Sequence, residues 1–129
     1  MGHEVKKIPE EIENDKNKQI LGVLSGKSCH GDIIEPLEEI FSRLSNVESF
    51  CPDGLNFAWC CWYTNGVVFA YGVGMHEVGL RLPPMHSKQD ERPGGFGGRW
   101  DGNEWWLIKW DSQSLERWAL MAYEYARNT

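Results

Sequence analysis

The sequence predicts an α+β domain, in which an antiparallel β-meander of about four strands packs with N-terminal and C-terminal helices. Three observations predict it. Asn65-Gly66 is the dipeptide that best suits a two-residue hairpin turn, because both central residues need positive φ. Residues 77–82 alternate apolar and polar side chains, as a half-buried strand does. Residues 112–126 carry apolar side chains at helical spacing.

Two helices are expected before the strands. Pro9, followed by three glutamates, suits the first turn of a helix that runs to about Leu24 and ends at Ser25-Gly26. Its apolar residues come mostly late, so its first half is expected to be solvated. A second helix is expected to begin near Glu35-Pro36 and to end at Ser45-Asn46. Its buried stripe has i, i+3, i+4, i+7 spacing: Leu37, Ile40, Phe41 and Leu44.

The central hairpin is apolar on both faces. With the turn at Asn65-Gly66, Trp62 faces Phe69, and strict alternation places Tyr71 on their side of the sheet. The other face holds Tyr63 and Cys61, together with Trp59, Val68 and Ala70. Such a hairpin is typical of a strand pair covered on two sides, so packing alone explains the aromatic and cysteine content.

The chain then continues to a third strand, a long loop, a fourth strand and a helix. In the third strand, Val78, Leu80 and Leu82 are expected to point inward, and Glu77, Gly79 and Arg81 outward. Residues 83–103 are dense in turn formers and predict a long irregular loop. A fourth strand is expected over 104–110, and Asp111 or Ser112 is expected to cap the final helix.

Length, composition and charge indicate the class of protein, its location and the partners that are disfavoured. The 129 residues are the usual length of one domain, and seven tryptophans argue against disorder. The formal net charge of −6 and the lack of a basic stripe disfavour direct nucleic-acid binding. The sequence contains no run of about 18 apolar residues, so no membrane span is predicted. The first residues have no apolar core of the kind that a secretory signal needs, so a cytoplasmic location is expected.

The four cysteines are Cys29, Cys51, Cys60 and Cys61, and none lies in a C-x-x-C or zinc-ribbon spacing. Reduced, buried thiols are expected, because a cytoplasmic protein seldom keeps disulfides. No histidine spacing predicts a metal site, and no cofactor is expected.

The runs NGVVFAYGVGMHEVGLRLPP, GGFGGRWDGNEWWLIKW and LERWALMAYEYARN resemble the TfoX (Sxy) N-terminal domain family. The resemblance covers about residues 33–128, so the chain divides into an extension over 1–31 with one helix and a TfoX-N-like region over 32–129. It implies a regulatory or interaction module without established catalytic residues. The YjbR-like and small luciferase-domain-like families share the same order of elements. The RMFGG that usually precedes the family's hairpin is replaced here by residues 56–60, and no second TfoX-like domain fits in this length, so a competence role is not implied.

One segment imitates a phosphate-binding loop. Residues 22–28, GVLSGKS, are one residue short of the P-loop pattern, and no clear strand precedes them. A helix that stops at Gly26 explains the segment better.

Six residues flank the third strand, the long loop and the fourth strand as candidates for binding: His76, Arg81, His86, Arg99, Asp101 and Trp105. The first functional interpretation is a small cytoplasmic, non-catalytic module that binds a protein partner. The alternative is a ligand-binding or enzymatic domain that takes a small anionic molecule in a cleft beside the 83–103 loop. A third is a homodimer formed through the aromatic fourth strand. No catalytic residue is assigned.

Overall fold

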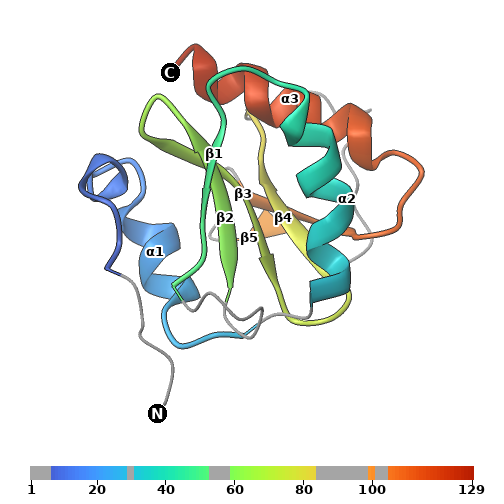
Figure 1. Cartoon of the computed structure of the whole chain (residues 1–129), viewed down its shortest axis with the longest axis horizontal. Helices are drawn as coiled ribbons and strands as arrows, with labels where there is room; N and C mark the ends of the chain where they lie inside the picture. Colours follow the sequence, from blue (N-terminus) through green and yellow to red (C-terminus); the bar gives the residue numbers. More distant parts are fainter. Residues whose placement is uncertain (1–6, 29–30, 53–58, 84–98, 101–104) are drawn as a thin grey trace.

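The computed structural model describes residues 7–28, 31–52, 59–83, 99–100 and 105–129. Within these ranges, three α-helices and six strands follow a short 3-10 helix at Glu10–Ile12 (Figure 1). The helices are α1 (Lys18–Leu24), α2 (Gly31–Ser42) and α3 (Leu115–Arg127). The strands are β1 (Glu48–Phe50), β2 (Cys60–Thr64), β3 (Val67–Val73), β4 (Glu77–Arg81), β5 (Arg99–Trp100) and β6 (Trp105–Lys109). The predicted α+β class is confirmed.

All six strands form one antiparallel sheet in the order β1-β2-β3-β4-β6-β5. The four central strands are the ones that the sequence predicts. The two edge strands were not expected, because three and two residues are too few for a period-two pattern to be recognised.

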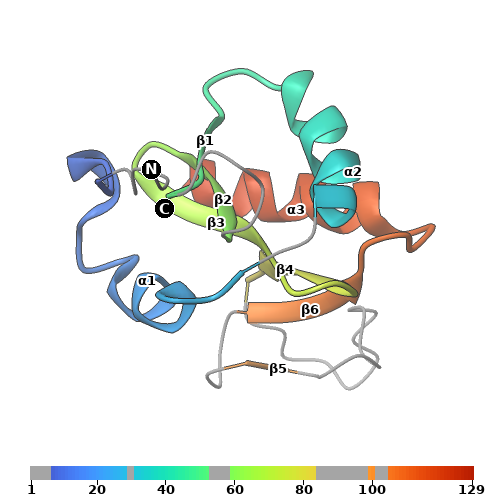
Figure 2. The ribbon, with the colours of Figure 1, turned by 60° about the horizontal axis from the view of Figure 1, so that its bottom comes forward.

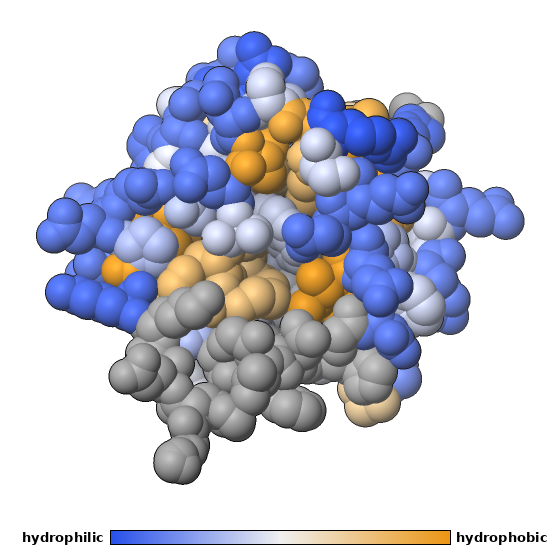
Figure 3. Space-filling model, in the orientation of Figure 1, coloured by the Kyte–Doolittle hydropathy of each residue, from blue (hydrophilic) through white to orange (hydrophobic). Residues whose placement is uncertain are grey.

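Helices cover both faces of the sheet. Figure 2 shows α1 on one side of the strands and α2 and α3 on the other. The core under α2 and α3 is built from Leu37, Phe41, Phe69, Leu80 and Trp118, among others. A second core lies under the 3-10 helix and α1, and includes Ile12, Ile20, Leu24, Val68 and Tyr71. Both faces of the hairpin are therefore buried, as its apolar pattern predicts. On the side of the molecule that Figure 3 shows, hydrophobic residues are visible only in small patches among polar ones.

The N-terminal segment differs from the single, half-solvated helix expected over 9–24. A turn separates the 3-10 helix from α1, and Ile12 and Asn17 in this part are fully buried. The cause is the side chain of Asn17, whose Nδ2 donates to the carbonyls of Ile12 and Gly66 at 2.9 and 2.8 Å, while its Oδ1 accepts from Val68 N–H at 2.9 Å. An asparagine that binds backbone groups in this way competes with helix continuation.

Two helix starts also differ from expectation. α2 begins at Gly31 and contains Pro36, one turn earlier than the proline suggested. α3 is preceded by Ser114 rather than Asp111 or Ser112, and the Ser112 hydroxyl instead accepts from the N–H of Ser114 at 3.1 Å. α2 ends at Ser42 and Asn46 has a φ of 61°, close to the expected stop.

A β-bulge changes the expected faces of the hairpin. Tyr63 faces Val68 as predicted, but the register shifts between Trp62 and Tyr63, so that Trp62 faces Ala70 instead of Phe69. Beyond the bulge Tyr71 faces Cys61 and belongs to the core under α1. Strict alternation had placed Tyr71 on the opposite face, and that prediction is wrong because one extra residue inverts every later side chain.

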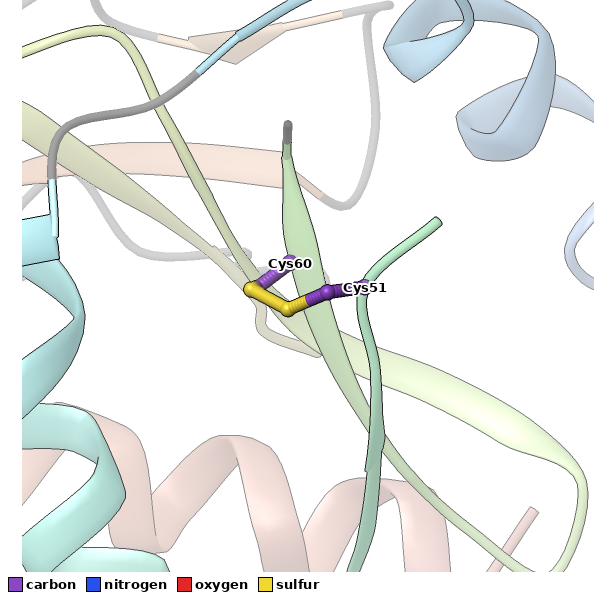
Figure 4. Close-up of a disulfide and its surroundings, with 2 residues drawn as sticks. All are labelled: Cys51 and Cys60. Atoms are coloured by element: carbon purple, nitrogen blue, oxygen red, sulfur yellow. A yellow bond between two sulfur atoms is a disulfide. The ribbon is translucent and has the colours of Figure 1, made fainter. Parts of the chain in front are cut away.

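The cysteines also differ from expectation. Cys51, just after β1, and Cys60, at the start of β2, form a disulfide with a Cα–Cα distance of 4.4 Å (Figure 4). Phe50 and Cys61 face each other in the β1–β2 register, so the disulfide lies directly beside this pair. Cys61 is a free, buried thiol, and burial raises its pKa to about 12. Cys29 lies outside the described residues.

Candidate functional site

A cleft opens between α1 and the turn that joins β3 to β4, on the face of the sheet opposite α2 and α3. We call it the α1 cleft, and its volume is about 610 Å³. Its walls come from the end of α1, residues 26–28, Tyr71, residues 73–77 and Leu107 of β6. This volume lies within the range of roughly 300–1,000 Å³ that is usual for small-molecule sites.

Two glycines shape the entrance. Gly26, with a φ of 79°, follows the end of α1 at Ser25, which confirms the interpretation of this segment as a helix stop. Gly74, with a φ of 77°, makes the β3–β4 turn. The N–H of Gly74 donates to the carbonyl of Ser28 at 2.8 Å, which fixes the segment after α1 against the turn. Residues far apart in the sequence are thereby held at the two sides of one opening.

The ring of Tyr71 forms part of the floor. It lies across Gly79 of β4, where a Cβ atom would overlap the ring. On its other side Tyr71 contacts Trp105, with ring centroids 5.2 Å apart. The missing side chain of Gly79 therefore leaves the space that the Tyr71 ring occupies.

Apolar and polar side chains divide the remaining lining. The apolar part is Val23, Leu24, Val73, Met75 and Leu107, of which Met75 on the rim is 60% exposed. The polar part is Lys27, Ser28, His76 and Glu77. Lys27 and His76 are exposed, whereas Glu77 is only partly so. An apolar floor with a few polar groups at its edge is the usual composition of a ligand site.

Glu77 is a lining residue of the cleft whose carboxyl is perturbed by burial. Burial raises the pKa of its carboxyl, and the electrostatic interaction with nearby His76 partly opposes that rise. Lys109 stands opposite Glu77 in the β4–β6 register. A perturbed carboxyl within a cleft is a feature of functional sites, although ion-pair networks produce it as well.

The six sequence-predicted residues separate in space where the structure describes them. His76 lines the α1 cleft. Arg81 stands at the other end of β4, roughly 16 Å away at the usual rise per residue. It is buried, contrary to the expected outward orientation of Arg81 and Gly79, and its guanidinium lies 4.8 Å from the ring centroid of Trp105.

Trp105 itself is buried between Arg81 and Tyr71, so it supports the floor of the cleft. The backbone of Arg99 pairs with Trp106 in the β5–β6 ladder. His86 and Asp101 lie outside the described residues. Four of the six therefore lie in the described ranges: His76 lines the cleft, and Arg81, Arg99 and Trp105 lie together at the other end of the sheet.

Sequence reasoning missed Lys27, Ser28 and Tyr71 as lining residues. The only local signal was the GVLSGKS segment, which contains Lys27 and Ser28 but does not match a nucleotide-binding pattern. Tyr71 lines the cleft because of the bulge, which no local pattern predicts.

Within the described ranges, no three His, Cys, Asp or Glu side chains gather as a metal site would require. No helix in the same ranges has the length and apolar character needed to cross a bilayer. Comparisons with known protein families, with curated proteins and with solved structures find no match for this chain.

Proposed function

We propose that the protein is a non-catalytic binding module that holds a small organic molecule in the α1 cleft. The observation that carries this proposal is the convergence of Lys27, His76 and Glu77 on an opening of about 610 Å³ with an apolar floor. A buried apolar surface supplies most of the affinity of a small ligand, and a few polar groups orient it.

The geometry also favours binding over catalysis. Nucleophilic catalysis needs an activated nucleophile beside a base. Cys61 is buried away from solvent, and burial raises the pKa of its thiol. Ser28 and His76 line the same opening, but within the described ranges no hydrogen bond joins the Ser28 hydroxyl to the His76 imidazole, as activation of a serine would require. We therefore assign orientation of a ligand, and no bond-breaking step, to these groups.

The test is a screen of small apolar carboxylates, amines and amino acids by amide chemical-shift perturbation in the ¹⁵N-labelled protein. Binding in the α1 cleft should shift the amides of Gly26, Gly74, His76 and Leu107 together. Val23→Trp fills the cleft from α1 and should abolish these shifts. Leu21→Trp is the matched control, because Leu21 is on the same helix but lines a different groove. No perturbation by any compound, or shifts that survive Val23→Trp, would refute the proposal.

A protein partner is the second candidate. Met75, on the rim of the cleft, is the exposed large hydrophobic residue of the described chain, and the resemblance to the TfoX N-terminal domain implies an interaction module. A partner or a second copy that docks here would protect Met75. Met75→Glu should then weaken a complex or homodimer, measured by sedimentation, without changing the melting temperature. A complex that is unaffected by Met75→Glu would exclude this rim as its interface.

A cytoplasmic location is part of the proposal, and the disulfide tests it. Cytoplasmic thiol systems keep most cysteines reduced, whereas oxidising compartments preserve disulfides. Alkylation of thiols in intact cells, followed by mass measurement, would show whether Cys51 and Cys60 are linked there. Full oxidation in every molecule would argue for an oxidising compartment.

A further inference from the structure

The α1 cleft carries opposite charges on two different walls. Lys27 follows α1 on one wall, and Glu77 begins β4 on the other. The contact between Ser28 and Gly74 holds these walls together, so the two charges face the same opening. A ligand in the cleft therefore meets a cation and a carboxylate at once.

The base of the cleft is apolar. Leu24 of α1, Val73 of β3 and Leu107 of β6 line it together with the ring of Tyr71. Such a base favours a ligand with an aliphatic or aromatic body, because burying apolar surface is the main source of affinity. The charged groups of that ligand would lie at the rim, near Lys27 and Glu77.

We propose that the ligand is a zwitterion with an apolar body, namely a free apolar amino acid or a short apolar peptide, whose carboxylate pairs with Lys27 and whose ammonium pairs with Glu77. This inference rests on the proposed function and specifies the class of ligand. A simple organic anion is repelled by Glu77, and a simple amine by Lys27. Only a molecule with both charges is complementary to both walls.

The state of Glu77 supports the same class. Partial burial makes its ionised form unfavourable, as the raised pKa of its carboxyl indicates. An ammonium group inserted beside it would stabilise the carboxylate through a charge-assisted hydrogen bond. Among the described residues, the charged or titratable groups that line the cleft with Glu77 are Lys27, His76 and Tyr71, and Lys109 lies opposite Glu77 in the β4–β6 register.

Calorimetric titration with four compounds tests the proposal. The probes are L-leucine, L-leucyl-L-leucine, 4-methylpentanoate, which lacks the ammonium, and isopentylamine, which lacks the carboxylate. At least one zwitterion should bind about five-fold or more tightly than both single-charge analogues, since each analogue leaves one charge of the cleft without its partner. The two zwitterions distinguish the free amino acid from the peptide.

Two variants assign the two ends of the ligand. Lys27→Met should weaken the binding of the zwitterion and leave the binding of isopentylamine unchanged or tighter. Glu77→Gln should weaken the zwitterion and leave 4-methylpentanoate unchanged or tighter. Lys18→Met and Glu13→Gln are matched controls that lie in a separate groove beside α1, and they should change nothing.

The possible failures can be told apart. If 4-methylpentanoate or isopentylamine binds in the α1 cleft as tightly as the zwitterions, the inference is wrong and the proposed function stands. If none of the four compounds binds while other compounds of the amide-shift screen occupy the cleft, the inference of a zwitterionic ligand is wrong and the proposed function stands. If no compound perturbs the cleft, both proposals fail.

Discussion

Asn17 shows how a single polar residue joins two parts of the chain that are distant in sequence. It is fully buried, and its side chain makes three hydrogen bonds to backbone groups of Ile12, Gly66 and Val68. Asn14 adds a second bond to the carbonyl of Gly66 at 2.9 Å, from an exposed position. The hairpin turn is thus held by the N-terminal segment, and Gly66 is needed there because a Cβ would come within 2.9 Å of the carbonyl of Glu11.

We expect Asn17→Ala to lower the free energy of unfolding by about 2 kcal/mol, because buried backbone groups lose their partners. Asn14→Ala, at a solvent-exposed position, should cost less than about 1 kcal/mol. Urea denaturation of both variants measures the difference. Equal effects would show that burial of Asn17 does not determine its contribution.

At the scale of elements, the hairpin shows what local sequence can and cannot predict. Asn65-Gly66 specifies the turn because its φ values of 53° and 76° are properties of those two residue types. The bulge at Trp62 and Tyr63 depends on how the strands pack against two layers of helices, and no local sequence pattern predicts it. The face of every later residue in β3 follows from that one event, including the position of Tyr71.

The candidate site was difficult to predict for the same reason. Its lining comes from the end of α1, the β3–β4 turn and β6, which meet only after the sheet has formed. His76 was recognisable as a polar residue at a strand end. Lys27 and Ser28 had no such signal, since exposed polar residues after a helix are common. Arg81 was predicted to point to solvent because an alternating strand usually has one solvated face. Here that face is also covered, by residues of α1 and β6.

The β1–β2 connection leads to a prediction about the thiols. The Cys51–Cys60 bond closes a loop with a sequence separation of nine and links the three-residue edge strand β1 to β2. Its reduction should lower the free energy of unfolding by about 2–3 kcal/mol, because the unfolded chain gains freedom. The double variant Cys51→Ala/Cys60→Ala should already have the lower stability without reductant. Adding reductant should lower its stability no further.

Thiol counting checks the same bond directly. Denaturant together with a reductant should reveal two more reactive thiols than denaturant alone. In the native protein Cys61 should stay unlabelled, since its thiol is buried and burial raises its pKa. An equal count with and without reductant would mean that Cys51 and Cys60 are free.

On the scale of the whole molecule, the sheet is the middle layer of a structure with two cores. α2 and α3 cover one face, and the N-terminal segment with α1 covers the other (Figure 2). Residues 8–28 therefore contribute to one of the two cores and form one wall of the α1 cleft. The region over 32–129 would leave Val68, Cys61 and Tyr71 uncovered on that face.

The final prediction compares the two cores. Ile20 of α1 and Leu37 of α2 are both buried, at 1% and 0% exposure, so Ile20→Ala and Leu37→Ala should each lower the free energy of unfolding by about 2–4 kcal/mol. Gln19→Ala, on the exposed side of α1, should change it by less than about 0.5 kcal/mol. Each variant should still unfold in one cooperative transition, because both cores share the same strands. If Ile20→Ala behaves like Gln19→Ala while Leu37→Ala is strongly destabilised, α1 does not contribute to the core, and the α1 cleft loses one of its walls.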